Sequence, residues 1–345
     1  MAKTYDEIIE SIFLGLNGDS PHDIEYLQEQ AEKYKDHELS KEITRAIGRK
    51  LYEVLPEEER AEVEAIFDNH GNSSENVIHE TILAMQQGEP GKALGIIEPF
   101  ATKLKELNES GLCLEDSVSA YYNFNSLIDH ILTVELTGQK KEVRLATEPF
   151  AEVYALYAGV LYELDRHEDA INWLEEALRW NPAATGFYFE IADNYKKLNE
   201  FAEAEKWDDK AYPFIANPSA LARWYRDKGF VAIEDGQYEL AAALFVISCI
   251  FEESPQAMSE LMFMKKHLNA DYTGMDVKEA AKVLERADVP IGPNPTTVGL
   301  LVGIEGLVEK QGDPNYAADI SYNIYCLTFD EEWLTKAQAL SGQQD

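Results

Sequence analysis

The 345-residue chain has few cysteines, few basic residues and no long apolar run. Its three cysteines, Cys113, Cys249 and Cys326, are far apart, odd in number and never form a C-x-x-C pair. This excludes a disulfide framework and a zinc knuckle, and it is typical of a reducing compartment. We therefore expect a cytoplasmic protein in which the three thiols act as small buried hydrophobes.

Basic residues are scarce as well. The chain has 30 Lys and Arg against 64 Asp and Glu, which gives a net charge of −34 at pH 7. Binding to nucleic-acid phosphates or to anionic lipid needs clustered cations, so the composition argues against both kinds of partner. It allows a basic or neutral protein partner, and it also keeps a folded protein soluble.

Apolar segments are too short to cross a bilayer. The longest, from Val298 to Val308, is interrupted by Glu305 and has about half the length that a spanning helix needs. Residues 1–18 carry Lys3 as their single base, and acidic residues interrupt their apolar side. This pattern predicts an amphipathic helix and not a signal peptide.

Motifs for chemistry are missing from the sequence. HExxH, P-loop, GxGxxG and GxSxG patterns do not occur, and no two of the seven histidines stand four residues apart. The polar segment 68–76 contains Asp, His and Asn but lacks the spacing of a calcium loop, so it is interpreted as a linker. We predict no catalytic residue, no cofactor and no metal site, while an enzyme of unrecognised type stays open.

Helical periodicity dominates what is present. Residues 4–17 place Ile8, Ile12 and Leu16 on one face, and similar faces follow after Ser20 and over 38–55. A fourth helix is predicted to begin at Pro56, where acidic residues suit the positive end of the helix dipole. Residues 1–70 are therefore predicted to form a small helical bundle.

A period of 34 residues appears in the middle of the chain. Small residues recur in step between units 151–184 and 185–218, and a third unit, 222–255, follows after three extra residues. The small residues of the three units are Ala158, Ala170 and Ala177, then Ala192, Ala204 and Ala211, then Gly229, Ala241 and Ser248. At these positions small side chains let neighbouring helices approach closely.

This pattern resembles the tetratricopeptide repeat, a helix–turn–helix unit of 34 residues. The resemblance implies an all-α fold, a tetratricopeptide-like superhelix of helical hairpins that follows the N-terminal bundle. Two positions depart from it. Asp208 replaces the usual aromatic residue of the second unit, and Lys228 interrupts the apolar pattern of the third.

The flanks of the repeats are predicted from weaker signals. Residues 74–110 and 297–332 share similar turns, QQGEPGKA and KQGDPNYAA, and are interpreted as diverged repeats. A long aromatic-rich helix is predicted over 112–136 and ends near Gly138. The predicted domains are an N-terminal bundle at 1–70, a diverged repeat or cap at 74–145, the regular repeats at 151–255, and diverged repeats with a capping helix at 256–345.

The resemblance implies a concave groove lined by the first helix of each unit. The candidate groove residues are Tyr162, Phe189, Asp193, Lys196, Lys197, Arg223, Arg226 and Phe230. The three aromatic rings could stack on apolar side chains of a peptide, and the four cations would form a basic patch on an acidic protein. The alternative interpretation is that these residues are ordinary solvated helix surface.

The function indicated is non-catalytic binding of a protein or peptide in this groove, as a scaffold or adaptor. Some members of the family hold a peptide carboxylate with Asn at the ninth position of consecutive units. This chain has Gly159 and Asp193 there, so that mode is not supported. A peptide-sensing regulator whose output is the N-terminal bundle is an alternative, although residues 1–70 contain no basic DNA-reading helix.

Overall fold

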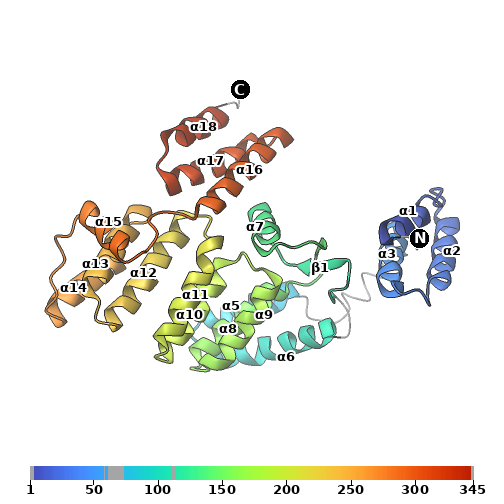
Figure 1. The fold of residues 1–345 in the computed structure, drawn as a ribbon. Helices are drawn as coiled ribbons and strands as arrows, with labels where there is room; N and C mark the ends of the chain where they lie inside the picture. Colours follow the sequence, from blue (N-terminus) through green and yellow to red (C-terminus); the bar gives the residue numbers. More distant parts are fainter. Residues whose placement is uncertain (1–3, 58, 61–73, 110–112, 343–345) are drawn as a thin grey trace.

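A computed structural model describes residues 4–57, 59–60, 74–109 and 113–342 (Figure 1). Within these residues the chain is a series of helices with two short strands, and the predicted all-α fold of helical hairpins is confirmed. Residues 68–73 of the predicted linker and most of the fourth helix predicted from Pro56 lie outside the described residues, whereas residues 74–76 are helical and not part of a linker.

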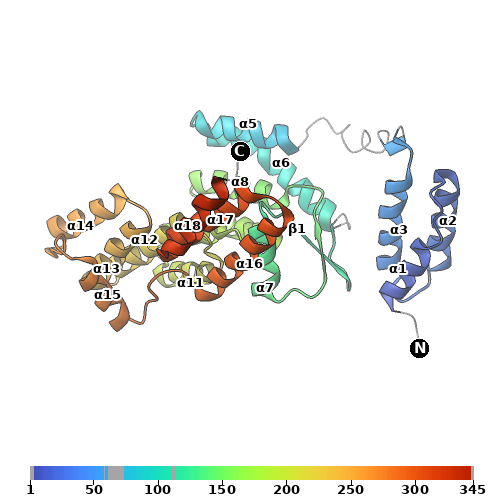
Figure 2. The same ribbon diagram turned by 90° about the horizontal axis from the view of Figure 1, so that it is seen from above.

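The N-terminal bundle has three described helices and a core of its own. The helices are α1 (Tyr5–Phe13), α2 (Ser20–Lys33) and α3 (Ser40–Val54). Ile8, Ile12, Leu27, Ile43 and Ile47 form a buried cluster separate from that of the other helices. The bundle lies at one end of the molecule in both views (Figures 1 and 2).

Helical hairpins stack side by side through the middle of the molecule (Figure 1). The first is α5 (Ser74–Gln86) with α6 (Pro90–Glu109). The three regular units are α8 (Phe150–Glu163) with α9 (His167–Trp180), α10 (Thr185–Lys197) with α11 (Phe201–Ala211), and α12 (Pro218–Glu234) with α13 (Tyr238–Phe251). A 3₁₀ turn, η1 (Tyr212–Phe214), separates α11 from α12.

The turn inside each regular hairpin repeats in detail. Asp165 and Asn199 stand 34 residues apart (199 − 165) and have φ of 56° and 61°; Gly236 has φ of 73°. The residue after each donates its backbone N–H to a carbonyl five residues earlier, at 2.8–2.9 Å. This left-handed C-cap satisfies a carbonyl that the helix end leaves free. Gly88 and Gly312 adopt the same conformation in the outer hairpins, so the similarity of the two outer turns is confirmed.

Small residues occupy the helix contacts that the period predicts. Eight of the nine are alanine or serine at 1% exposure or less. The ninth, Gly229, is a close approach: a Cβ there would lie 2.9 Å from the ring of Phe245. The spacing of 34 therefore reflects helix-to-helix packing inside and between units.

The prediction of one long helix over residues 112–136 is wrong. This segment forms strand β1 (Ser119–Tyr122) and helix α7 (Leu127–Thr137), and β1 pairs in parallel with β2 (Glu142–Leu145). The Asp116 carboxylate accepts the N–H groups of Val118 and Ser119 and turns the chain into the strand. Ser126 then caps α7 by accepting the N–H of Asp129, so a new helix begins.

The C-terminal part turns back over the stack. After α13 come α14 (Pro255–His267) and α15 (Val277–Arg286), and then α16 (Pro295–Gln311), α17 (Pro314–Thr328) and α18 (Glu331–Ser341). α15 packs on α13, whereas α16 packs on α7 and η1 (Figures 1 and 2). The α16–α18 unit therefore lies over the side of the stack and does not extend its end.

Candidate functional site

The eight candidate groove residues lie on the first helices of three consecutive units. Tyr162 is on α8; Phe189, Asp193, Lys196 and Lys197 are on α10; Arg223, Arg226 and Phe230 are on α12. Ion pairs and ring contacts connect these helices across the unit boundaries. We call these eight residues the helix-A face.

An ion-pair network holds α10 against α12. Lys196 Nζ lies 3.0 Å from Asp193 Oδ1 and 2.8 Å from Asp227 Oδ1. Arg223 Nη2 lies 2.8 Å from Asp193 Oδ2, and its Nε lies 3.5 Å from Asp227 Oδ2. Two cations thus face two carboxylates, and the network is neutral.

Pairing changes the interpretation of the predicted basic patch. Arg226 also has a partner, because its Nη2 lies 2.9 Å from Glu252 Oε2. Lys197 differs from the other three cations: its side chain is exposed, it has no carboxylate partner among the described residues, and its Nζ lies 5.7 Å from the centre of the Tyr162 ring. The four cations are therefore not one free basic surface.

The three aromatic candidates differ in their exposure. Phe189 is 1% exposed, and the Arg223 guanidinium covers its ring at 4.9 Å. The proposal that this ring stacks directly on a peptide is wrong, because Phe189 belongs to the core beneath the face. Tyr162 and Phe230 are half-buried, and Phe230 lies 6.0 Å from Lys196 Nζ. The accessible part of the helix-A face consists of Tyr162 and Lys197, together with the exposed portions of Arg223 and Phe230.

Buried polar partners beneath the face were not predicted. Asp227 is the carboxylate that connects Lys196 and Arg223. His167 Nδ1 lies 3.0 Å from Asn194 Oδ1 at the joint of the first two units. The spacing of four residues from Arg223 is the signal that could have found Asp227, because residues at i and i+4 lie on one face of a helix.

The two departures from the repeat pattern are both buried. Asp208 is fully buried, and Lys228 is 9% exposed. Lys228 Nζ lies 2.9 Å from both Glu205 Oε1 and Asp209 Oδ1. Burial disfavours its charged form, yet hydrogen bonds to these carboxylates outweigh that effect and raise the pKa of Lys228. Lys228 thereby ties α12 to α11.

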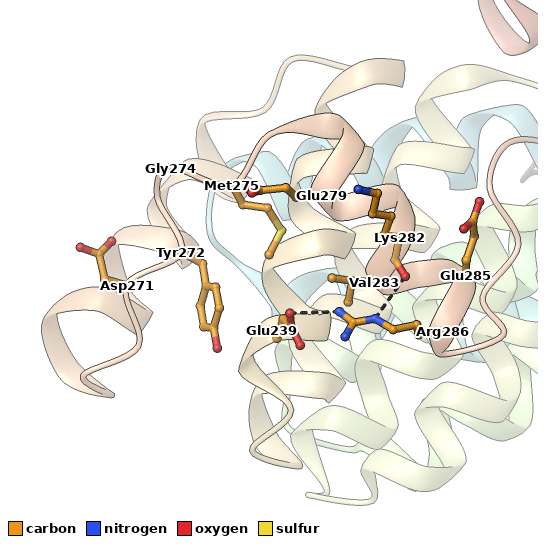
Figure 3. Close-up of a pocket in the computed structure, with 10 residues that line it drawn as sticks. All are labelled: Glu239, Asp271, Tyr272, Gly274, Met275, Glu279, Lys282, Val283, Glu285 and Arg286. Carbon is orange, nitrogen blue, oxygen red and sulfur yellow. Dashed lines mark hydrogen bonds and ion pairs between the residues drawn. The ribbon is translucent and has the colours of Figure 1, made fainter.

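A pocket of about 770 Å³ lies on another part of the molecule, between the start of α13, the α14–α15 loop and α15 (Figure 3). It is lined by Glu239, Asp271, Tyr272, Gly274, Met275, Glu279, Lys282, Val283, Glu285 and Arg286. Arg286 Nη2 lies 3.1 Å from Glu239 Oε1, and Asp271 pairs with Lys265 at 2.9 Å. Hydrogen bonds from Lys265 and Thr273 lower the pKa of Asp271 to about 2. The wall has no single sign of charge that would select a ligand.

The described residues offer neither a cluster of metal ligands nor a membrane-spanning helix. Within the described residues, no group of three or more His, Cys, Asp or Glu side chains could hold a metal ion. In the same part of the chain, no helix is both long and apolar enough to cross a membrane. The three cysteines are free thiols, with Cys113 buried and the other two half-buried.

Comparison with known proteins assigns neither a family nor a specific activity to the chain. The sequence matches no protein-family model and no curated protein. The chain is similar to a crystal structure of a tetratricopeptide repeat protein from Parabacteroides merdae ATCC 43184. The two are 14% identical, each chain is covered over 98% of its length, and the TM-score is 0.33.

Proposed function

We propose that the protein is a non-catalytic scaffold that binds a segment of a partner protein on the helix-A face. The observation that carries this proposal is the position of Lys197 and Tyr162. They contact each other across two units, stay accessible, and lie beside the ion-pair network that connects α10 with α12. Because the neighbouring ion pairs hold α10 against α12, the backbone that carries Lys197 loses little conformational entropy on binding.

The expected partner is a protein and not a polyanion. With Lys196, Arg223 and Arg226 already paired to carboxylates, the face has few cations left for phosphates. A half-buried tyrosine with an accessible cation is a common anchor for a peptide side chain or backbone. The cytoplasmic location expected from the cysteine content stays a prediction.

Site-specific crosslinking tests this proposal. A photo-crosslinking amino acid at position 197 should join the protein to a discrete partner in cells. The same amino acid at Lys206, an exposed lysine of α11, is the matched control and should give no such product. Tyr162→Ala should weaken the product at position 197 several-fold. Equal products from positions 197 and 206, or no effect of Tyr162→Ala, would contradict the proposal.

A second function is favoured by one contact of the N-terminal bundle. Arg45 of α3 donates through Nη1 to Asp116 Oδ2 at 2.9 Å and to the Leu114 carbonyl at 2.8 Å. The bundle is thus tied to the segment that leads into β1. If binding to the repeats shifts that segment, the bundle would move with it, which is what a peptide-sensing regulator requires.

A further inference from the structure

Asp208 stands where the neighbouring units have core residues. It occupies the position of Leu174 in the first unit and Phe245 in the third, both 1% exposed. Asp208 itself has an exposure of 0%. Neither of its carboxyl oxygens has a hydrogen-bond partner among the described residues. An ionised carboxylate in such a place is costly, and a group of this kind takes up a proton instead.

The charged side chains around Asp208 already form ion pairs with one another. α10 contributes Asp193 and Lys196, α12 contributes Arg223, Asp227 and Lys228, and α11 itself contributes Glu205 and Asp209. Lys196 is bonded to Asp193 and Asp227, and Lys228 is bonded to Glu205 and Asp209. In the described part of the chain no cation is left to pair with Asp208, and Asp227 adds a like charge nearby.

We propose that Asp208 is a buried proton-binding site at the joint between the second and third units, and that loss of its proton opens this joint as the pH rises. A proton fits where a metal does not, because the described residues hold no group of three or more metal ligands. The inference concerns the joint alone and does not rest on the proposed binding function.

The direction of the pH effect follows from linkage. Burial, and next the charge of Asp227, raise the pKa of Asp208 well above the ordinary value for an aspartate. The closed joint therefore binds a proton that the opened joint releases. The proton's contribution is complete below the ordinary aspartate pKa of about 3.9 and is lost as the pH rises toward the folded pKa. Between these two pKa values the equilibrium constant for opening of the joint grows by up to about tenfold per pH unit. Above the folded pKa it levels off.

Opening the joint would change the helix-A face. Asp193, Lys196 and Arg223 connect α10 with α12, and Asp208 lies on the helix that joins these two along the chain. A separation of α11 from α12 would therefore loosen the network that positions the face. A change of pH at this joint would therefore change how the second and third units pack against each other.

Infrared spectroscopy tests whether Asp208 holds a proton. The full chain, at a pH about two units above the ordinary aspartate pKa, should show the carbonyl stretch of un-ionised carboxyl groups. Asp208→Asn should lose the intensity of one such group. Asp209→Asn, which alters an exposed carboxylate on the same helix, should keep it. A wild-type spectrum without this band, or full wild-type intensity in Asp208→Asn, would overturn the proposal.

Hydrogen exchange tests the opening of the joint. After correction for the intrinsic rate, exchange in α11 and α12 of the wild type should rise with pH by up to about tenfold per unit. Asp208→Asn should remove this dependence, and Asp209→Asn should retain it. If Asp208→Asn does not fold, Asp208→Leu, which restores the apolar character seen in the other units, takes its place. The same pH dependence in the wild type and in the position-208 variant would refute the proposal.

Discussion

At the scale of single residues, Gly229 is the tightest contact of the repeat. A Cβ added there would lie 2.9 Å from the buried ring of Phe245, and that ring is 1% exposed, so it has little room to move. We expect Gly229→Ala to lower the free energy of unfolding by about 1–3 kcal/mol, the usual cost of overpacking. Urea unfolding followed by circular dichroism measures this change.

The control for this substitution is another helical glycine. A Cβ at Gly159 on α8 would meet nothing within 4 Å. Gly159→Ala should therefore raise the free energy of unfolding by about 0.5–1 kcal/mol, because alanine loses less backbone entropy in a helix. If both variants shift the stability in the same direction, the close approach at Gly229 is not what determines the choice of glycine.

Residue positions were easier to predict than residue environments. The period placed all eight candidate residues on first helices, and the structure agrees. It did not separate Phe189, which is buried, from Tyr162, which is half-buried. That difference depends on Arg223 from the next unit, which covers the Phe189 ring. The position of a residue within its own unit does not predict which side chains of the next unit will cover it.

At the scale of elements, the segment 112–136 shows where local pattern fails. Its run of tyrosines and small residues fits one face of a helix and also fits a strand. The strand is selected by pairing with residues 142–145, of which Val143 faces Ala120 in the register. That partner follows the helix α7, outside any short window of sequence. Gly138, by contrast, ends the helix through its own φ of 68°, and this was predictable.

The C-terminal unit depends on one buried carboxylate. Glu305 of α16 is 1% exposed; it accepts a hydrogen bond from Ser321 of α17 at 3.1 Å and pairs with Lys336 of α18 at 2.6 Å. We expect Lys336→Met to lower the stability of this unit by about 1–3 kcal/mol, because it leaves a buried acceptor without its charged partner. Hydrogen exchange in α16–α18 measures the loss.

Glu309 provides the matched control for that substitution. It also pairs with Lys336, at 2.9 Å, but its side chain is 45% exposed. Glu309→Gln should change the stability by no more than about 0.5 kcal/mol, as is usual for a surface position. A loss from Glu309→Gln as large as that from Lys336→Met would show that the surface pair, and not buried Glu305, stabilises the unit.

At the scale of the whole molecule, the placement of the α16–α18 unit could not be read from the repeat. The period predicts hairpins, and α16 with α17 is one. The direction in which they stack depends on the linker before Pro295, where Tyr225 donates to the Pro290 carbonyl at 2.9 Å and accepts the Gly292 N–H at 2.8 Å. These long-range bonds fix the linker against α12 and turn the unit back over the stack.

The N-terminal bundle is attached to the repeats by polar contacts. Arg45 pairs with Asp116 at 2.9 Å, and Arg49 donates to the Tyr121 hydroxyl at 3.4 Å. Partial burial opposes ionisation of Asp116, but hydrogen bonds from Ser119, Val118 and Arg45 prevail and lower its pKa. The contact is therefore complete above the ordinary aspartate range and weakens as the pH falls through the lowered pKa.

Removing these two arginines should release the bundle. The Arg45–Asp116 pair is partly buried, and Arg49 donates a single hydrogen bond to a tyrosine hydroxyl. Two such contacts stabilise the docked bundle by only a few kcal/mol, so Arg45→Ala with Arg49→Ala should shift the balance towards detached conformations. Small-angle scattering should then report a larger radius of gyration, and high salt should move the wild type in the same direction because it screens the contact. Lys41→Ala on the same helix should leave the radius unchanged.

A bundle that can be released at so small a cost is one that a partner bound to the repeats could also release. An unchanged radius in the double variant would argue against the regulatory function, because the contacts of Arg45 and Arg49 would then not be what holds the bundle for a ligand to release.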